Sequence, residues 1–333
     1  MAIKCRSLKI FPPVSKYSLI RGMLKCRILI FAFGFFSVCA TALEIPTQTL
    51  KRPDGSVIDF YLLNKSDESP SDTLLLILQG SDCNSVLKVE SIFSDFRYVW
   101  PAADLLLVEK YGITRELEYS SDSERPDCPQ TYLRNDSPKQ RVSDAKAVLQ
   151  AVRGDSAYPR LIVLGGSEGA LVANLLAAEL NTIDATVAFN GGGRMFIDDV
   201  LHSIRTGAAS SEEAVEATQG FLGFSNHVLS SEPSDLEVSG HGYRWWHQML
   251  SIDQLSVLKA VNTPLLVIQG GLDTSVSPEK VNEMIESLRK AQKNNIDFIP
   301  YENLDHTFND EQEVSHQDEV VEDIRQWLKS KLI

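Results

Sequence analysis

Residues 161–180 read LIVLGGSEGALVANLLAAEL, and this stretch decides the fold. Leu161 to Leu164 form a short, unbroken apolar run, which is typical of a β-strand buried on both faces. Ala170 to Leu180 form an apolar helix. Between them stands Gly165-Gly166-Ser167-Glu168-Gly169, a G-x-S-x-G sequence. Its glycines allow a sharp turn from strand to helix, so the turn would project the side chain of Ser167.

Strands and helices also alternate on both sides of this stretch. Helical patterns begin at Pro138 and Pro278, and apolar runs typical of buried strands occur at 73–78, 104–108, 185–189 and 265–268. This alternation predicts a mostly parallel sheet covered on both faces, in a doubly wound α/β domain over residues 43–333. Residues 194–262 interrupt the alternation. We interpret them as a mostly helical insertion that forms a lid over a cleft.

The first 42 residues have the three parts of a secretory signal peptide. They contain several basic residues and no acidic one, then an apolar run at 28–38 and the sequence Ala40-Thr41-Ala42. The apolar run is shorter than the roughly 20 residues that a membrane-spanning helix needs. We predict cleavage after Ala42 and export to the periplasm or the medium. An uncleaved anchor is the alternative, and Met23 is an alternative translation start.

Charge and cysteine content restrict the class of protein further. The chain has 32 Lys and Arg against 45 Asp and Glu, a net charge of −13. This balance argues against nucleic-acid binding, which needs a basic face, and against stable association with an anionic membrane after cleavage. Cys83 and Cys128 are the two cysteines beyond the predicted signal peptide. Two cysteines in an exported protein predict one disulfide.

A serine hydroxyl needs a general base before it can act as a nucleophile. In an elbow of this kind the expected order along the chain is serine, acid, histidine. Of the six histidines, His306 fits best, because it follows the last expected strand and precedes the C-terminal helix. Asp273 directly follows the strand at 265–268, at the edge where α/β sheets build their sites. We therefore predict a triad in which Ser167 attacks, His306 is the base and Asp273 orients it.

Acyl transfer also needs N–H donors that stabilise the oxyanion. We predict the backbone amide of Glu168, directly after the nucleophile, as one donor. The other donor comes from the loop after an early strand, which here is Gln79-Gly80-Ser81-Asp82. We choose the amide of Ser81, with Asp82 as the alternative.

These residues resemble the conserved parts of the α/β-hydrolase superfamily. The matching pieces are Gln79-Gly80, the G-x-S-x-G sequence, the segment PLLVIQGGLD at 264–273 and Asp305-His306-Thr307-Phe308. The resemblance covers nearly all of residues 47–333, and within the superfamily the chain is similar to serine aminopeptidase-like and dienelactone hydrolase-like members. It implies hydrolysis of esters, thioesters, lactones or short peptides without a cofactor. The chain departs from the superfamily at Gln79-Gly80, where many members have His-Gly, so the second oxyanion donor stays open.

The predicted substrate is a small molecule or a short peptide, and no metal site is expected because no His or Cys pair has ligand spacing. His241, Tyr243 and Trp245 of the insertion are expected to line the pocket. An apolar slot would favour acyl esters or thioesters, whereas a carboxylate that binds an amine would favour an aminopeptidase. Acidic residues of the insertion include Glu212, Glu213, Glu232 and Asp235. The alternative from another class is a catalytically silent hydrolase fold used for binding, which predicts a broken triad.

Overall fold

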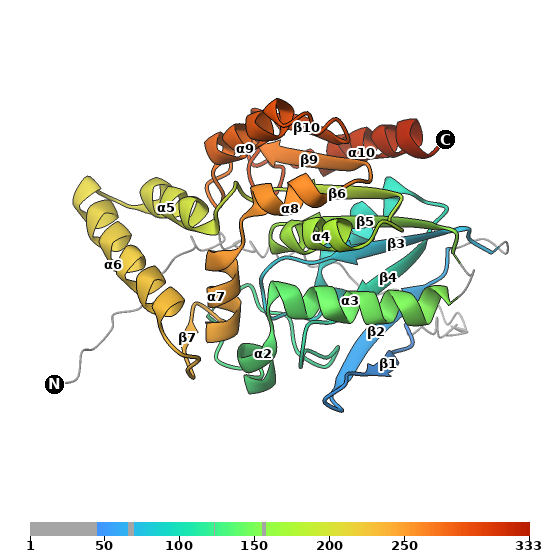
Figure 1. The fold of residues 1–333 in the computed structure, drawn as a ribbon, viewed down its shortest axis with the longest axis horizontal. Helices are drawn as coiled ribbons and strands as arrows, with labels where there is room; N and C mark the ends of the chain where they lie inside the picture. Colours follow the sequence, from blue (N-terminus) through green and yellow to red (C-terminus); the bar gives the residue numbers. More distant parts are fainter. Residues whose placement is uncertain (1–44, 66–69, 123, 155–157) are drawn as a thin grey trace, which may run out of the picture.

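The computed structural model describes residues 45–65, 70–122, 124–154 and 158–333 (Figure 1). The predicted signal peptide lies outside the described residues. The core is a sheet in the order β1-β2-β4-β3-β5-β6-β9-β10. β2 pairs antiparallel with both β1 and β4, and the remaining neighbours are parallel. The strands are β1 Gln48–Lys51, β2 Val57–Leu63, β3 Thr73–Leu78, β4 Asp104–Val108, β5 Arg160–Gly166, β6 Ala185–Phe189, β9 Leu265–Gly270 and β10 Ile296–Tyr301.

Helices cover both faces of this sheet, and the predicted doubly wound α/β fold is confirmed. One apolar layer lies between the sheet and α3 (Pro138–Arg153), α4 (Glu168–Glu179), α8 (Gln254–Ala260) and α9 (Pro278–Lys290). The other layer lies under α1 (Glu90–Ser94), the short 3₁₀ helices η1 (Val86–Lys88) and η2 (Phe96–Val99), and α10 (Gln317–Leu332). β3 is buried along its whole length, as its unbroken apolar run predicted.

Two Ser-Pro pairs begin helices where the sequence predicted them. The side chain of Ser137 accepts a hydrogen bond from the amide of Gln140, and that of Ser277 accepts one from the amide of Lys280. The proline after each serine occupies the first turn, where its missing N–H has no helical partner to lose. These caps fix the starts of α3 and α9 against the sheet.

Most of the chain between β6 and β9 lies beyond the ends of the strands, at the left of Figure 1. It contains α5 (Phe196–Gly207), α6 (Ser211–Ser230), α7 (Tyr243–Ser251) and the two-residue strands β7 (Glu237–Val238) and β8 (His241–Gly242). These elements share an apolar cluster of their own, to which α4 contributes Leu171. The last part of the predicted insertion behaves differently. Leu255 and Leu258 of α8 are buried in the main core, so α8 belongs to the helical layer of the sheet.

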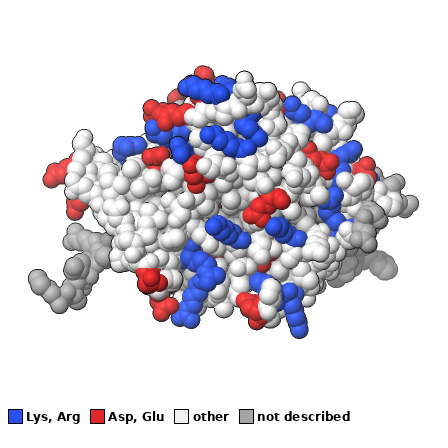
Figure 2. Space-filling view, viewed as in Figure 1, with Lys and Arg blue, Asp and Glu red and all other residues white. Residues whose placement is uncertain are grey.

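The surface carries charges of both signs. Figure 2 shows basic and acidic side chains interspersed on the viewed face, with a largely uncharged area at the left, over the insertion. Within the part of the chain that the structure describes, no helix is long and apolar enough to cross a membrane.

Candidate active site

Ser167 lies in a strained turn between β5 and α4. Its backbone has φ 55° and ψ −127°, a conformation that residues with a Cβ rarely adopt. The turn is tight enough that a Cβ on Gly165 would lie 2.1 Å from the carbonyl oxygen of Gly169. A Cβ on Gly169 would in turn lie 2.1 Å from the carbonyl oxygen of Leu78. The glycines are therefore required by packing, and they hold Ser167 in the geometry of a nucleophile elbow.

Asp273 and His306 come together from the loops that follow β9 and β10. His306 Nδ1 lies 2.7 Å from Asp273 Oδ2. The other carboxylate oxygen of Asp273 accepts hydrogen bonds from the backbone amides of Ser275, at 2.8 Å, and Val276, at 3.0 Å. Gln269 Nε2 adds a hydrogen bond of 3.0 Å to Oδ2. The carboxylate is thus fixed on both oxygens, and one of them orients the imidazole.

This contact changes the proton affinity of His306. Burial alone would lower the pKa of His306, but the negative charge of Asp273 and the hydrogen bond to it outweigh burial, so the pKa is raised above 6.5. The side chain of Asp273 is fully buried, whereas a quarter of the His306 side chain is exposed. Because the contact to Asp273 uses Nδ1, Nε2 is the ring nitrogen that remains for proton transfer.

Ser167 and His306 line the same cavity, whose volume is about 230 Å³. It lies between the ends of the strands and the helices α5 and α7. Most of its wall is apolar or aromatic, from Leu171, Phe196, Val200, Trp245, Trp246, Met249, Ile252 and Val276. Pockets that hold drug-sized ligands measure roughly 300–1,000 Å³, so this cavity fits a smaller group.

The loop after β3 lies against Ser167. A Cβ on Gly80 would be 3.4 Å from the Cβ of Ser167, and Ser81 lines the cavity. The carbonyl oxygen of Ser81 accepts a hydrogen bond of 3.4 Å from the hydroxyl of Tyr132. Asp82, the alternative oxyanion donor, does not line the cavity. Its carbonyl oxygen accepts a hydrogen bond from the ammonium group of buried Lys110.

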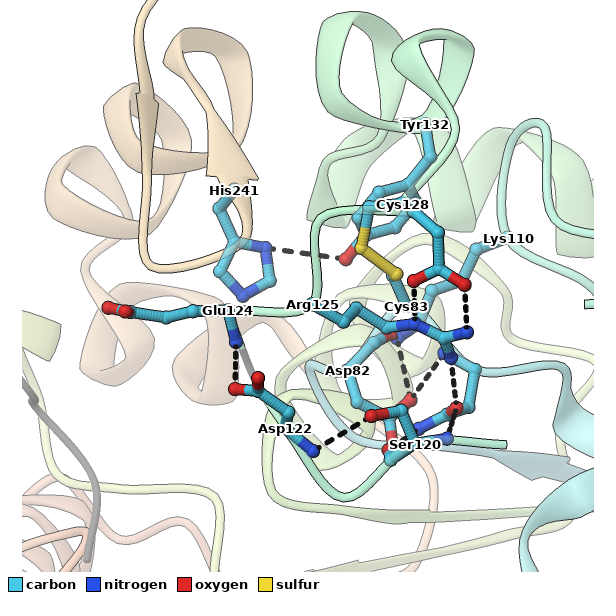
Figure 3. The surroundings of a disulfide bond; sticks show 12 residues. Asp82, Cys83, Lys110, Ser120, Asp122, Glu124, Arg125, Cys128, Tyr132 and His241 are labelled. Atoms are coloured by element: carbon cyan, nitrogen blue, oxygen red, sulfur yellow. Dashed lines mark hydrogen bonds and ion pairs between the residues drawn. A yellow bond between two sulfur atoms is a disulfide. The ribbon is translucent and has the colours of Figure 1, made fainter. Parts of the chain in front are cut away.

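The predicted disulfide between Cys83 and Cys128 is present, with the two Cα atoms 6.0 Å apart. Figure 3 shows it beside Tyr132, the third residue of α2 (Gln130–Asn135), and near His241. Both cysteines are buried. The bridge therefore joins the loop after β3 to the segment that leads into α2.

Two of the three predicted pocket residues line the cavity. His241 stacks on Trp245, with ring centroids 3.7 Å apart, and its Nδ1 lies 3.3 Å from the Tyr132 hydroxyl. Burial lowers the pKa of His241 to about 4, so this ring is neutral near pH 7. The expectation for Tyr243 is wrong. Its hydroxyl donates to the carbonyl oxygens of Val228 and Ser231, away from the cavity.

The helix α7 explains why Tyr243 and Trp245 differ. Residues two apart on a helix point to different sides, whereas residues four apart share a side. Tyr243 and Trp245 are two apart on α7, so they cannot both face the cavity. His241 precedes this helix, in β8, and its ring stacks on that of Trp245.

The side chain of Glu168 forms a contact that the sequence analysis missed. Its Oε1 accepts a hydrogen bond of 3.0 Å from Arg141, and its Oε2 accepts one of 3.0 Å from Trp245 Nε1. Arg141 also donates to the carbonyl oxygen of Gln79, at 2.6 Å. The only available signal was a charged residue at the start of an apolar helix. That signal calls for a partner but does not identify Arg141.

Comparison with known proteins agrees with this architecture. Residues 207–332 match the model of the prolyl oligopeptidase family. The structure resembles the esterase Est1E from Butyrivibrio proteoclasticus, with a TM-score of 0.56, 14% identity, and coverage of 86% of this chain and 98% of that one. It also resembles an esterase from Pyrococcus furiosus, with a TM-score of 0.55, 16% identity, and coverage of 87% and 92%.

A third similar structure belongs to a longer protein. It is the acylaminoacyl peptidase of Pyrococcus horikoshii, with a TM-score of 0.54, 15% identity, and coverage of 87% of this chain and 41% of that one. No curated protein sequence matches the chain. The likenesses establish the fold, which is that of the α/β hydrolases.

Proposed function

We propose that this protein is an exported esterase or thioesterase that removes a small apolar acyl group through a covalent acyl-enzyme. Ser167 attacks the carbonyl carbon, and His306 accepts the proton of its hydroxyl. His306 then gives that proton to the leaving group, which departs as an alcohol or thiol. Water, activated by the same histidine, releases the acyl group as a carboxylic acid. Asp273 holds the imidazole and stabilises its charged form.

The oxyanion is proposed to bind the backbone amides of Glu168 and Ser81. Glu168 begins α4, where helix N–H groups have no partner within the helix. Ser81 lines the same cavity as Ser167 and lies in the loop that Tyr132 and the disulfide contact. Support of this loop matters, because loss of one oxyanion donor costs roughly 100- to 1,000-fold in rate.

The wall of the cavity is the observation that favours an acyl ester over a free amino terminus. Among the described residues that line the cavity, Glu168 is the only acidic one. Both of its carboxylate oxygens are already bound, to Arg141 and Trp245. Glu212, Glu213, Glu232 and Asp235, which we considered as amine ligands, do not line the cavity and are exposed. An ammonium group would therefore enter an apolar site without a counter-charge, which is costly.

The partial match to the prolyl oligopeptidase family favours a second candidate function, the cleavage of short peptides. The triad chemistry is the same for both candidates, so only the substrate distinguishes them. A peptide with a blocked amino terminus would avoid the cost of the ammonium group. The test below therefore includes such a peptide.

Residues 194–251 are proposed to act as a lid. α5 and α7 supply much of the cavity wall opposite Ser167, including Phe196, Val200 and Met249. Export is proposed from the signal-peptide pattern of residues 1–42, and the disulfide supports it because such bridges persist in oxidising compartments.

The test is labelling of the purified protein with a fluorophosphonate, followed by mapping of the modified peptide. We expect modification of Ser167 and its loss in His306→Ala. Ser203→Ala is the matched control, because Ser203 lines the same cavity and should not affect labelling. Lack of labelling in folded protein would contradict the proposal and favour the silent binding fold.

Substrate choice is then measured with p-nitrophenyl esters of increasing acyl length, aminoacyl amides and an N-acetylated dipeptide. We expect kcat/KM to rise by up to about fourfold for each methylene until the cavity is filled. Faster cleavage of the aminoacyl amides would contradict the esterase proposal. Faster cleavage of the blocked peptide would favour the second candidate.

A further inference from the structure

One side of α5 is bonded to the loop that carries Asp273. His202 Nε2 lies 2.9 Å from the backbone carbonyl oxygen of Asp273. One turn earlier, Asp199 accepts a hydrogen bond of 2.9 Å from the amide of Ser277. One turn later, the Thr206 hydroxyl lies 3.2 Å from the carbonyl oxygen of the residue that follows Asp273. Three successive turns of α5 thus contact the loop at 273–277.

The contact of His202 has a defined direction. A carbonyl oxygen only accepts hydrogen bonds, so His202 Nε2 must carry the proton and donate it. The carboxylate of Asp273 is already held by two amides of its own loop and by Gln269. Those contacts fix the carboxylate relative to the loop. The bond from His202 fixes the backbone of Asp273 relative to α5.

Asp199, one turn before His202 on α5, also holds this helix against the loop at 273–277. Its carboxylate is buried and accepts hydrogen bonds from the amides of both Gly193, at 3.1 Å, and Ser277. Gly193 belongs to the loop after β6, and Ser277 caps α9. Asp199 therefore joins two neighbouring loops at the edge of the sheet and gives α5 a fixed position against them.

The adjacent side of α5 forms part of the cavity. Phe196, Val200 and Ser203 line it from α5, and Ser275 and Val276 line it from the loop of Asp273. The same helix thus contacts both the space for the acyl group and the backbone of the proposed catalytic acid.

We propose that His202 is a positioning residue, which holds the backbone of Asp273 so that its carboxylate meets His306 at the productive distance and angle. The inference rests on the proposed function, since it assigns His202 a role in the same hydrolysis. In the sequence, His202 lies within the insertion at 194–262. The structure connects this insertion residue to the triad through one hydrogen bond.

The test compares three variants. His202→Ala removes the donor, and His202→Gln keeps an N–H donor on a side chain of similar reach. His227→Ala is the matched control, because His227 is an exposed histidine of α6 that bonds only locally, to Ser231. We expect His202→Ala to lower kcat by about 10- to 100-fold with little change in KM, since small misplacements of catalytic groups have effects of this size. We expect His202→Gln to recover most of the loss and His227→Ala to match the wild type.

A spectroscopic readout separates this inference from the proposed function. The ring ¹⁵N and ¹H chemical shifts of His306 report its hydrogen bond to Asp273 in the resting protein, whether or not the protein hydrolyses a substrate. His202→Ala should shift these resonances, and His202→Gln should restore them. Unchanged resonances in His202→Ala would overturn the inference, even if kcat falls. Shifted resonances in a protein that a fluorophosphonate does not label would support the positioning role and contradict the proposed function.

If His202→Ala does not fold, His202→Leu replaces it, because leucine fills much of the same space without a donor. Folding of each variant is checked by thermal unfolding before the resonances are compared. A His202→Leu protein with wild-type resonances and wild-type kcat would overturn the inference.

Discussion

Two pairs of oppositely charged or acid–base side chains lie near the turn of Ser167, and they differ in how far they are exposed. Asp273 and His306 are 2.7 Å apart, and Glu168 and Arg141 are 3.0 Å apart. The side chains of Glu168 and Arg141 are almost fully enclosed, with exposures of 1% and 6%. His306 is 25% exposed, at the wall of the cavity. We call Glu168 and Arg141 the closed pair, and Asp273 and His306 the open pair.

The contacts of the closed pair all lead to other protein groups. Glu168 is bonded to Arg141 and Trp245, and Arg141 also reaches the carbonyl oxygen of Gln79. The pair thus joins α4, α3, α7 and the start of the loop after β3. A buried pair of this kind stabilises a geometry, whereas a pair with one face toward a cavity can exchange a proton with a bound molecule. Ser167 and Glu168 are adjacent in sequence and both line the cavity, but both carboxylate oxygens of Glu168 are bound by protein groups.

The largest expected effect tests the open pair. Ser167→Ala should lower kcat by about 10⁶-fold, as removal of the nucleophile does in a serine protease, with little change in thermal stability. Alanine keeps the Cβ, so the substitution does not relieve the backbone strain of the positive φ at position 167. The comparison is between hydrolysis of a p-nitrophenyl ester and the unfolding temperature. If Ser167→Ala lost activity and also unfolded at a much lower temperature, Ser167 would have a structural role, as Glu168 has.

The next largest effect tests the closed pair. Arg141→Met leaves the carboxylate of Glu168 buried without its cation, which should lower the free energy of unfolding by about 3–5 kcal/mol. Adding Glu168→Leu removes the unpaired charge and should recover part of this loss, because an apolar pair can replace a buried ion pair. Urea unfolding of the two single variants and the double variant measures both the loss of unfolding free energy and its recovery. Additive losses in the double variant would show that the two residues do not act as a pair.

The disulfide lies next to the loop that faces the open pair. Replacing Cys83 and Cys128 by alanine opens a loop with a sequence separation of 45 and should lower the free energy of unfolding by about 2–4 kcal/mol. Because the bridge supports the loop of Ser81, kcat should fall more than KM changes. Unfolding with and without reductant on the wild type provides the check. A stability loss without any change in kcat would separate the bridge from the proposed oxyanion site.

The sequence could predict the open pair because each of its residues follows an expected strand, of which β9 is buried and β10 is half-buried. Asp273 comes after β9 and His306 after β10, and the carboxyl ends of parallel strands meet at one edge of the sheet. Apolar runs locate such strands well, so the residues directly after them can be placed without knowing the packing. The same reasoning located Ser167 and the loop of Ser81.

The closed pair could not be predicted in this way. Arg141 lies on α3, where the apolar pattern of Val142 and Ala145 fixes the buried side but leaves the partner of a neighbouring polar side chain undefined. Only the packing of α3 against α4 brings its guanidinium to Glu168. The orientation of Tyr243 depended in the same way on where α7 begins, which the sequence did not define.

The smallest expected effect concerns pH and sharpens the contrast between the pairs. The proposed base must be neutral, and the pKa of His306 is raised above 6.5, so kcat/KM should fall tenfold per pH unit below that pKa and level off above it. For Glu168, burial alone would raise the pKa, but Arg141 and Lys110 outweigh it and lower the pKa, so this carboxylate stays ionised in the same pH range. Arg141→Met should therefore leave the acid limb of the profile in place. Asp273→Asn should move this limb to lower pH, because the negative charge that raises the pKa of His306 is removed. If the limb instead shifts in Arg141→Met, the titrating group belongs to the closed pair.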